Sequence, residues 1–347
     1  MSGKTRRFVL SSALAAAGAG ALMAFGREVA SASTEPPIKI RFGWQPTLNG
    51  ARYFAAHDAG IFRANGIEVA TIEFLAGPPF FAAFGSGSID VGFMGTPPAS
   101  VGIAQGVPMK IFAVENYAFA SEALVATKQS GIKSLKDLKG KRVATQRGTS
   151  GHYGLIRGLE SVGLSLKDVH FVNLDVSVLL PAFTKGEVDA GWYWEPWQGE
   201  MREAGGVQIV TDDDVGAAGG IVWVARPDWL EKNPEAVARL LRSLDQASAL
   251  LSKNPDQIAR DLHKDIGVSE ALAQTVIGKE AKWPTMREEW DPNYVLSVNP
   301  SAVKQGKGLV SVLNKLANFQ YQVRAIDKVP NFAQAIDTTA LAHYVSS

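Results

Sequence analysis

The sequence of 347 residues contains no cysteine, and this absence excludes several classes of protein. Without thiols the chain can form neither a disulfide framework nor a zinc–thiolate site. A lipoprotein carries its lipid on a cysteine at its mature N-terminus, so we expect no lipid-anchored form. The sequence therefore predicts a protein without covalent cross-links between its segments.

The chain also lacks an excess of charge, because 35 lysines and arginines stand against 34 aspartates and glutamates. This balance offers no bulk attraction to nucleic acid or to a membrane surface. Three enzyme signatures are missing as well: the nucleophile elbow, the P-loop and the zinc-protease helix. The histidines show no metal-ligand spacing; they are His57, His152, His170, His263 and His343. We therefore expect no catalytic residue, no metal, no cofactor and no nucleic-acid partner.

Only one long apolar stretch occurs, at 8–25, and it is rich in Ala and Gly. Basic residues precede it, Arg6-Arg7 among them, and the small-x-small site Ala30-Ser31-Ala32 follows it. This order is typical of a cleaved export signal of the twin-arginine type at 1–32. The alternative is a retained membrane anchor, for which the stretch is short and weakly apolar. We expect a periplasmic protein whose mature part is not inserted in the membrane.

An internal repeat is the strongest signal of organisation in the chain. The pattern Ala-Phe-x-x-Gly-x-(Ile/Val)-Asp-x-Gly-aromatic at 83–93 returns without a gap 99 residues later, at 182–192. A period this long does not fit a solenoid. Each copy contains the same cycle of strand, helix, strand, short helix and strand, which favours parallel sheets. The repeat therefore predicts two related α/β lobes.

The lobes are expected to be interleaved along the chain. After the export signal, 36–118 forms the first part of lobe 1 and 119–224 forms lobe 2. The remainder, 225–347, returns to lobe 1 as a helical segment. The stretch 234–251 carries apolar residues at helical spacing, such as Leu240, Leu241 and Leu244, and this pattern indicates a helix that faces the core.

A cleft between the lobes is the expected binding site, because ligands of open parallel sheets lie beyond the carboxyl ends of the strands. The rule selects six loops, which are 44–49, 76–79, 95–98, 146–152, 175–177 and 194–197. The repeat gives Thr96 and Glu195 equivalent positions. If the lobes face each other, these two residues approach one cleft from opposite sides.

Two loops of the expected second lobe contain polar and aromatic residues, and two roles are open for each of them. The Thr149 and Ser150 hydroxyls precede a predicted helix. They either cap that helix or bind an anion together with free N–H groups and the helix dipole. Trp194, at a strand end, either belongs to the core or lines the cleft. Glu195 is either a solvated charge or the partner of a ligand ammonium group or of Arg147.

Short motifs in a fixed order give the chain a family resemblance. They lie at 60–62, 66–68, 87–90, 95–98, 116–117, 121–124, 135–141, 152–153, 186–190 and 194–196. Together they resemble the taurine- and alkanesulfonate-binding proteins of ABC importers, within the wider nitrate/sulfonate/thiamine-precursor binding superfamily. The segment Asn116 to Leu124, with His152-Tyr153, is most similar to the taurine branch.

The resemblance implies a two-lobed periplasmic binding protein of type II-like α/β fold. Two mixed, mostly parallel sheets are flanked by helices, and the ligand cleft lies between the lobes. It implies a monomer that binds a small sulfonate-like anion and delivers it to an ABC permease/ATPase complex. The ligand-binding positions that it implies are Gln45, Gly77, Thr96, Asn116, Tyr117, Glu122, Thr149, Ser150, His152, Trp194 and Glu195.

One departure from the taurine branch leaves the ligand open. Taurine-binding proteins carry an acid just before a Val-Trp-Val strand, where this chain has Ile221. Either Glu195 or Glu122 replaces that acid, or the ligand lacks an ammonium group. The alternatives are a binding protein for nitrate, an aromatic sulfonate or carboxylate, or a thiamine pyrimidine precursor. A further alternative is an enzyme like thiamine-pyrimidine synthase.

Overall fold

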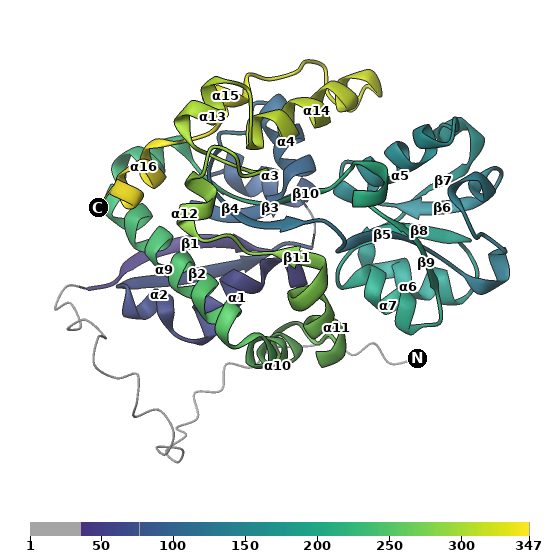
Figure 1. Cartoon of the computed structure of the whole chain (residues 1–347), viewed down its shortest axis with the longest axis horizontal. Coiled ribbons are helices and arrows are strands. Elements are labelled where there is room, and N and C mark those ends of the chain that lie inside the picture. Colours follow the sequence, from purple (N-terminus) through teal and green to yellow (C-terminus); the bar gives the residue numbers. More distant parts are fainter. Residues whose placement is uncertain (1–35, 76, 347) are drawn as a thin grey trace, which may run out of the picture. The chain divides into compact units, whose positions relative to one another are not determined.

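Two mixed β-sheets, each flanked by helices, organise the protein (Figure 1). The computed structural model describes residues 36–75 and 77–346, and the expected export signal at 1–32 lies outside them. Among the helices of the described residues, none has the length and apolar character that crossing a membrane requires. The predicted fold class, two mixed sheets flanked by helices, is confirmed.

The first sheet has six strands in the order β11-β4-β10-β3-β1-β2. The second has five, in the order β7-β6-β8-β5-β9. The strand bounds are β1 (Ile38–Trp44), β2 (Ile67–Glu73), β3 (Val91–Gly95), β4 (Lys110–Ala118), β5 (Glu122–Ala126), β6 (Arg142–Thr145), β7 (His170–Asn173), β8 (Ala190–Trp194), β9 (Val207–Thr211), β10 (Gly219–Ala225) and β11 (Ala281–Lys282).

The two sheets share one topology, as the sequence repeat predicts. In the first sheet β1 pairs in parallel with β2 and β3, and in the second β6 pairs in parallel with β7 and β8. Each sheet then continues through an antiparallel strand, β10 in the first and β5 in the second. The repeat covers the end of α3 (Gly77–Gly85) and β3, and correspondingly α6 (Val176–Thr184) and β8.

The aspartate of the repeated pattern has the same structural role in both lobes. Asp90 accepts hydrogen bonds from the backbone N–H and the guanidinium of Arg41, in the middle of β1. Asp189 does the same for Arg142 in the second sheet. The carboxylate therefore ties the third strand of each cycle to its first strand, which explains why this residue recurs in both copies.

The chain crosses between the sheets twice. Residues 119–121 connect β4 to β5, and residues 212–218 connect β9 to β10. The structure places β10 in the first sheet, whereas the expected boundary assigned 219–224 to lobe 2. The return to the first sheet therefore begins at Gly219. The division of the chain into two lobe domains, joined at these crossings, stays a prediction.

Helices cover the faces of the two sheets. Those not yet named are α1 (Ala51–Asp58), α2 (Ile61–Ala64), α4 (Thr96–Ala104), α5 (Ser150–Ser161), α7 (Trp197–Glu203), α8 (Pro227–Lys232), α9 (Pro234–Lys253), α10 (Pro255–Ile266), α11 (Glu270–Thr275), α12 (Met286–Trp290), α13 (Pro300–Lys304), α14 (Leu309–Gln322), α15 (Phe332–Ala335) and α16 (Thr339–Ser346). The predicted core-facing helix is α9, which buries Leu240, Leu241 and Leu244 completely.

The apolar core divides as the sheets do. One large cluster surrounds the first sheet and includes α9, while two smaller clusters occupy the two faces of the second sheet. Trp192 belongs to one of these smaller clusters and Tyr193 to the other, because successive side chains of a strand point to opposite faces. Each sheet is therefore a rigid platform for the loops at its strand ends.

Candidate binding pocket

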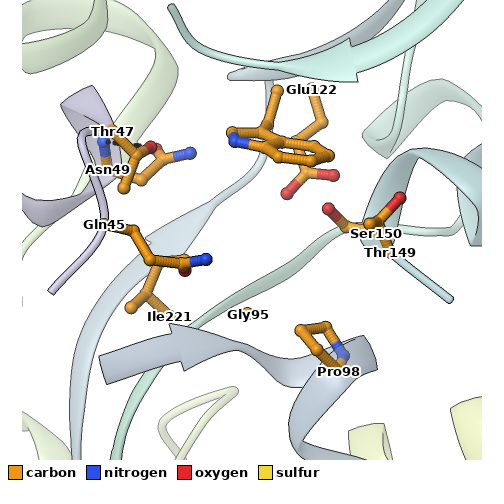
Figure 2. Close-up of a pocket in the computed structure, with 10 residues that line it drawn as sticks. Gln45, Thr47, Asn49, Gly95, Pro98, Glu122, Thr149, Ser150 and Ile221 are labelled. Atoms are coloured by element: carbon orange, nitrogen blue, oxygen red, sulfur yellow. Dashed lines mark hydrogen bonds between the residues drawn. The ribbon is translucent and has the colours of Figure 1, made fainter. Parts of the chain in front are cut away.

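A small pocket lies where loops and strands of both sheets meet (Figure 2). Residues after β1, β3 and β6 and at the end of β8 contribute to its wall, as the strand-end rule predicts. The lining residues are Gln45, Thr47, Asn49, Gly95, Pro98, Glu122, Thr149, Ser150, Trp194 and Ile221.

Two amide side chains line the pocket on the first-sheet side. Gln45 is mostly buried there. Asn49 accepts hydrogen bonds at its carbonyl oxygen from the Asn116 Nδ2 (3.1 Å) and the Ser121 hydroxyl (2.7 Å). These bonds fix the orientation of the Asn49 amide, and its buried Nδ2 has no partner. Because an unpaired buried N–H is costly, this group is a ready donor for a ligand.

Helix α5 presents its N-terminus to the pocket on the second-sheet side. Thr149 caps the helix, since its Oγ1 accepts from the His152 N–H (3.4 Å) and donates to the Gln146 carbonyl (2.6 Å). The backbone N–H groups of Ser150 and Gly151 belong to the first turn, which has no intrahelical acceptors for them. With the helix dipole, they favour negative charge at this point.

Glycines allow α5 to lie directly against β8. A Cβ atom at Gly151 would stand 2.2 Å from the Trp192 carbonyl oxygen, and one at Gly154 would stand 2.4 Å from the Trp192 Nε1. A Cβ at Gly158 would meet the same indole ring at 2.6 Å. These three residues form one face of α5, and their lack of side chains sets the position of its N-terminus at the pocket.

Residues on the two sides of the pocket touch through Glu195 and its neighbours. The Thr47 hydroxyl donates to the Glu195 carbonyl oxygen at 2.8 Å, across the interface. The Glu195 carboxylate is fully buried and pairs with Arg202 on α7 at 2.5 Å. Arg202 also contacts Glu280, from the return segment, at 3.3 Å. Glu195 therefore holds the interface together, and its partner is Arg202 rather than Arg147.

Two titratable side chains near the pocket are strongly affected by burial. Burial raises the pKa of Glu122, against smaller lowering effects of Ser150 and Asp212. Burial and the charge of Arg147 lower the pKa of His152 to about 4, so its imidazole is neutral at neutral pH. Its Nε2 is buried and has no hydrogen-bond partner.

The structure brings together some of the predicted site residues and separates others. Gln45, Glu122, Thr149, Ser150 and Trp194 line the pocket. Thr96 and Tyr117 line a neighbouring cavity of about 640 Å³ instead. Asn116, His152 and Glu195 line neither of these cavities: Asn116 orients Asn49, His152 packs beneath the α5 cap, and Glu195 pairs with Arg202. Gly77 is the first residue of α3.

Five of the residues that line the pocket are not among the predicted site residues: Thr47, Asn49, Gly95, Pro98 and Ile221. The first four lie in the predicted loops 44–49 and 95–98, but the sequence does not say which residues of a loop turn inward. Ile221 lines the pocket in the place where the taurine branch carries an acid. The acid that does face this pocket is Glu122, so the resemblance identified a position whose chemistry differs in this chain.

No group of three or more metal-ligating side chains occurs in 36–75 and 77–346. The polar atoms at the pocket instead comprise amide, hydroxyl and backbone N–H donors from both lobes, with the Glu122 carboxyl beside them. Donors of this kind can bind a small anion without a cationic side chain.

Comparisons with known proteins agree with this architecture. The family model described as NMT1/THI5 like matches residues 47–258. The taurine-binding periplasmic protein of Escherichia coli (strain K12) is 30% identical over 63% of this chain and 68% of its own length. The solved periplasmic aliphatic sulphonate binding protein of Escherichia coli aligns with a TM-score of 0.71 and 25% identity, over 87% of this chain and 92% of that chain.

A second solved relative, the alkanesulfonate-binding protein of Xanthomonas axonopodis pv. citri bound to MOPS, has a TM-score of 0.73. The two sequences are 22% identical, and the alignment covers 88% of this chain and 99% of that chain. Sequence identity at this level shows a shared fold alone. Enzymes also occur among the relatives. The 4-amino-5-hydroxymethyl-2-methylpyrimidine phosphate synthase of Schizosaccharomyces pombe is 28% identical over 64% of this chain and 68% of its own length.

Proposed function

Since the chain belongs to the NMT1/THI5-like family, we propose that it is the periplasmic substrate-binding component of an ABC importer for a small sulfonate. The observation that carries the proposal is the pocket itself, in which anion donors from both lobes converge. Its partners are the sulfonate and the permease/ATPase complex that receives it. The named relatives that bind taurine and aliphatic sulfonates support this assignment.

The donor set suits a sulfonate for a physical reason. A sulfonate is ionised throughout the physiological pH range, so its recognition needs hydrogen-bond donors rather than a titrating base. Neutral donors such as Gln45, Asn49 and the Ser150 N–H solvate it without a buried ion pair, whose desolvation would cancel much of the gain. The residues of this set stay a proposal.

The number of donors is sufficient for useful affinity. Hydrogen bonds to a charged group contribute about 1.5–3 kcal/mol each. Four or five of them exceed the roughly 8 kcal/mol of a micromolar complex, and the surplus offsets ligand ordering and closure of the lobes. Ligand binding would then shift the population from the open to the closed form, and the closed form is the state that a transporter recognises.

We propose that the protein binds its ligand without changing it chemically, although two relatives are enzymes. The desulfurization enzyme whose structure aligns at a TM-score of 0.65 is only 16% identical over 89% of this chain and 99% of its own, so it bears on the fold alone. In an incubation followed by proton NMR, a bound sulfonate is expected to be recovered unchanged. Conversion of the ligand would assign the chain to the enzymes of this fold.

The binding proposal is tested by calorimetric titration of the purified protein with ethanesulfonate, 2-aminoethanesulfonate, benzenesulfonate, nitrate and acetate. At least one sulfonate is expected to bind in the micromolar range or tighter. Gln45→Ala should weaken it by about tenfold or more through loss of one donor. Ser86→Ala, at an exposed serine far from the pocket lining, is the matched control. Binding of nitrate or acetate but no sulfonate would support an alternative ligand class.

A further inference from the structure

The loops that lead into β6, β7 and β8 carry an excess of positive charge. They span 127–142, 163–170 and 184–189, and they contain eight lysines and arginines against four acids. The chain as a whole is almost neutral, so this excess is a local feature of one part of the second sheet. These eight cations, the basic edge, are Lys128, Lys133, Lys136, Lys139, Lys141, Arg142, Lys167 and Lys185.

The sheet topology brings these three loops together. The strands β6, β7 and β8 are parallel neighbours, so all three begin at the same edge of the sheet (Figure 1). Backbone hydrogen bonds join the loops there, from the Thr127 N–H to the Asp189 carbonyl oxygen (2.9 Å) and from the Gly140 N–H to the Asp168 carbonyl oxygen (2.7 Å). The pocket lies at the opposite ends of these strands, where Trp194 ends β8. The basic edge is therefore a surface separate from the pocket.

The acids of these loops have structural partners other than the lysines. Asp137 and Asp168 each close a capping box with the serine three residues earlier, so they accept hydrogen bonds from backbone N–H groups. Asp189 is paired with Arg142 at 2.7 Å. Six lysines of the basic edge are exposed and form no ion pair within the described chain: Lys128, Lys133, Lys136, Lys139, Lys167 and Lys185.

The repeat supplies an internal comparison for this surface. At the corresponding edge of the first sheet, Lys39 of β1 lies 3.7 Å from Glu68 of β2, and Arg226 pairs with Asp228 at 2.6 Å. The contact between the repeated aspartate and an arginine occurs in both sheets, so the shared topology uses that pair. A run of unpaired lysines is not a requirement of this topology, which leaves the basic edge free for an anionic partner.

The chemistry of the basic edge favours one kind of partner. All of its cations except Arg142 are lysines, whose mobile point charges suit a diffuse layer of anions better than a two-point contact with one carboxylate. Protein–protein interfaces are depleted in lysine and have an apolar centre, whereas no large exposed apolar side chain of the described residues lies in these loops. The basic edge also lines neither of the two cavities described above. An extended anionic surface meets these conditions.

We propose that the basic edge adsorbs the protein on the anionic phospholipid headgroups of a membrane. Clusters of about four to eight lysines and arginines are attracted to such surfaces, and each cation raises the partition coefficient about fivefold. The contact is electrostatic and needs no inserted apolar segment. The inference goes beyond the proposed function, because it concerns where the protein resides rather than what it binds. Adsorption would raise its concentration beside a permease in that membrane.

The test is vesicle flotation of the protein recovered from the periplasm, with phosphatidylcholine vesicles that contain or lack phosphatidylglycerol. The wild-type protein is expected to bind the anionic vesicles at least about tenfold better, and high salt should abolish the difference. The triple variant Lys133→Gln, Lys136→Gln and Lys139→Gln should lower this binding by about tenfold or more. Lys167→Gln with Lys185→Gln, from the other two loops, is a second variant with the same expected direction.

The matched control removes the same charge from another part of the surface. Lys253→Gln, Lys304→Gln and Lys307→Gln change three exposed lysines of the return segment. This control should bind the anionic vesicles as the wild-type protein does, because the attraction depends on the local cluster and not on net charge.

Each other outcome overturns the inference. Equal flotation with both kinds of vesicle, or an equal loss in the basic-edge and control variants, would show that the basic edge does not bind the membrane surface. Retention of the wild-type protein on immobilised polyglutamate without flotation would assign the basic edge to an acidic protein instead. Titration with sulfonates is a separate readout, because the variants leave the pocket intact and should keep the wild-type ligand affinity. Failure of sulfonate binding therefore overturns the proposed function alone.

Discussion

Replacing Gly154 with alanine tests how the structure positions the α5 N-terminus at the pocket. Gly154 lies within α5, where glycine is normally a poor choice and alanine stabilises an exposed helix by about 1 kcal/mol. Here the new Cβ would stand 2.4 Å from both the Asp212 Oδ1 and the Trp192 Nε1. The substitution therefore sets a favourable helix propensity against a steric conflict.

The steric conflict is expected to win. Trp192 is completely buried and Asp212 is 2% exposed, so neither side chain has free space into which it can move. Overpacking of this kind costs about 1–3 kcal/mol. After the gain in helix propensity, we expect Gly154→Ala to lower the free energy of unfolding by about 1–2 kcal/mol. It should also weaken ligand binding, because α5 must shift away from β8.

The assay is urea unfolding followed by circular dichroism, with Gly85→Ala as the control. Gly85 ends α3, and a Cβ there would meet no atom within 4 Å. Gly85→Ala should therefore be neutral or slightly stabilising. A Gly154→Ala protein that is as stable as the Gly85→Ala protein, and binds ligand with wild-type affinity, would refute the close packing of α5 on Trp192.

Three further perturbations follow from the site. Thr149→Ala should lower the free energy of unfolding by about 1 kcal/mol, because it removes the N-cap of α5. Ser150→Ala should leave stability nearly unchanged, and equal stability of the two variants in urea would contradict the capping role of Thr149. The folded-state pKa of His152, about 4, lies below its ordinary value of 6.5, so protonation favours the unfolded state as the pH falls. The free energy of unfolding should therefore drop by about 2 kcal/mol between pH 7 and pH 5. In matched urea titrations, His152→Asn should largely abolish this loss. Arg202→Met should destabilise the protein by about 1–3 kcal/mol, because it removes the hydrogen-bond donor of the buried Glu195 carboxyl, whose pKa burial raises to about 8. Adding Glu195→Gln should recover part of this loss, and an additive double variant would show that the pair is not coupled.

The architecture was predictable because it depends on patterns that the sequence carries openly. The repeat at 83–93 and 182–192 predicts two cycles of the same topology, and β3 and β8 occupy equivalent places in their sheets. Its shared aspartate binds an arginine of the first strand in each cycle, Arg41 and Arg142. That contact joins residues far apart in the chain, which periodicity does not reveal.

The pocket was predictable by loop but only partly by side chain. The strand-end rule depends on topology, so it identified the loops that carry Gln45 and Ser150. The direction of an individual side chain depends on tertiary partners that local sequence does not specify. Glu195 turns to Arg202 on the next helix, and Asn49 is oriented by Asn116 and Ser121. The sequence does not mark Asp212, because Glu122 becomes its neighbour only through the pairing of β5 and β9.

A crystal structure of the protein grown with 2-aminoethanesulfonate tests the central claim most directly. One ligand is expected in the pocket between the sheets, with sulfonate oxygens within hydrogen-bond distance of the Gln45 and Asn49 amides and of the first N–H groups of α5. An empty pocket at saturating ligand, or a ligand bound elsewhere on the molecule, would contradict the account.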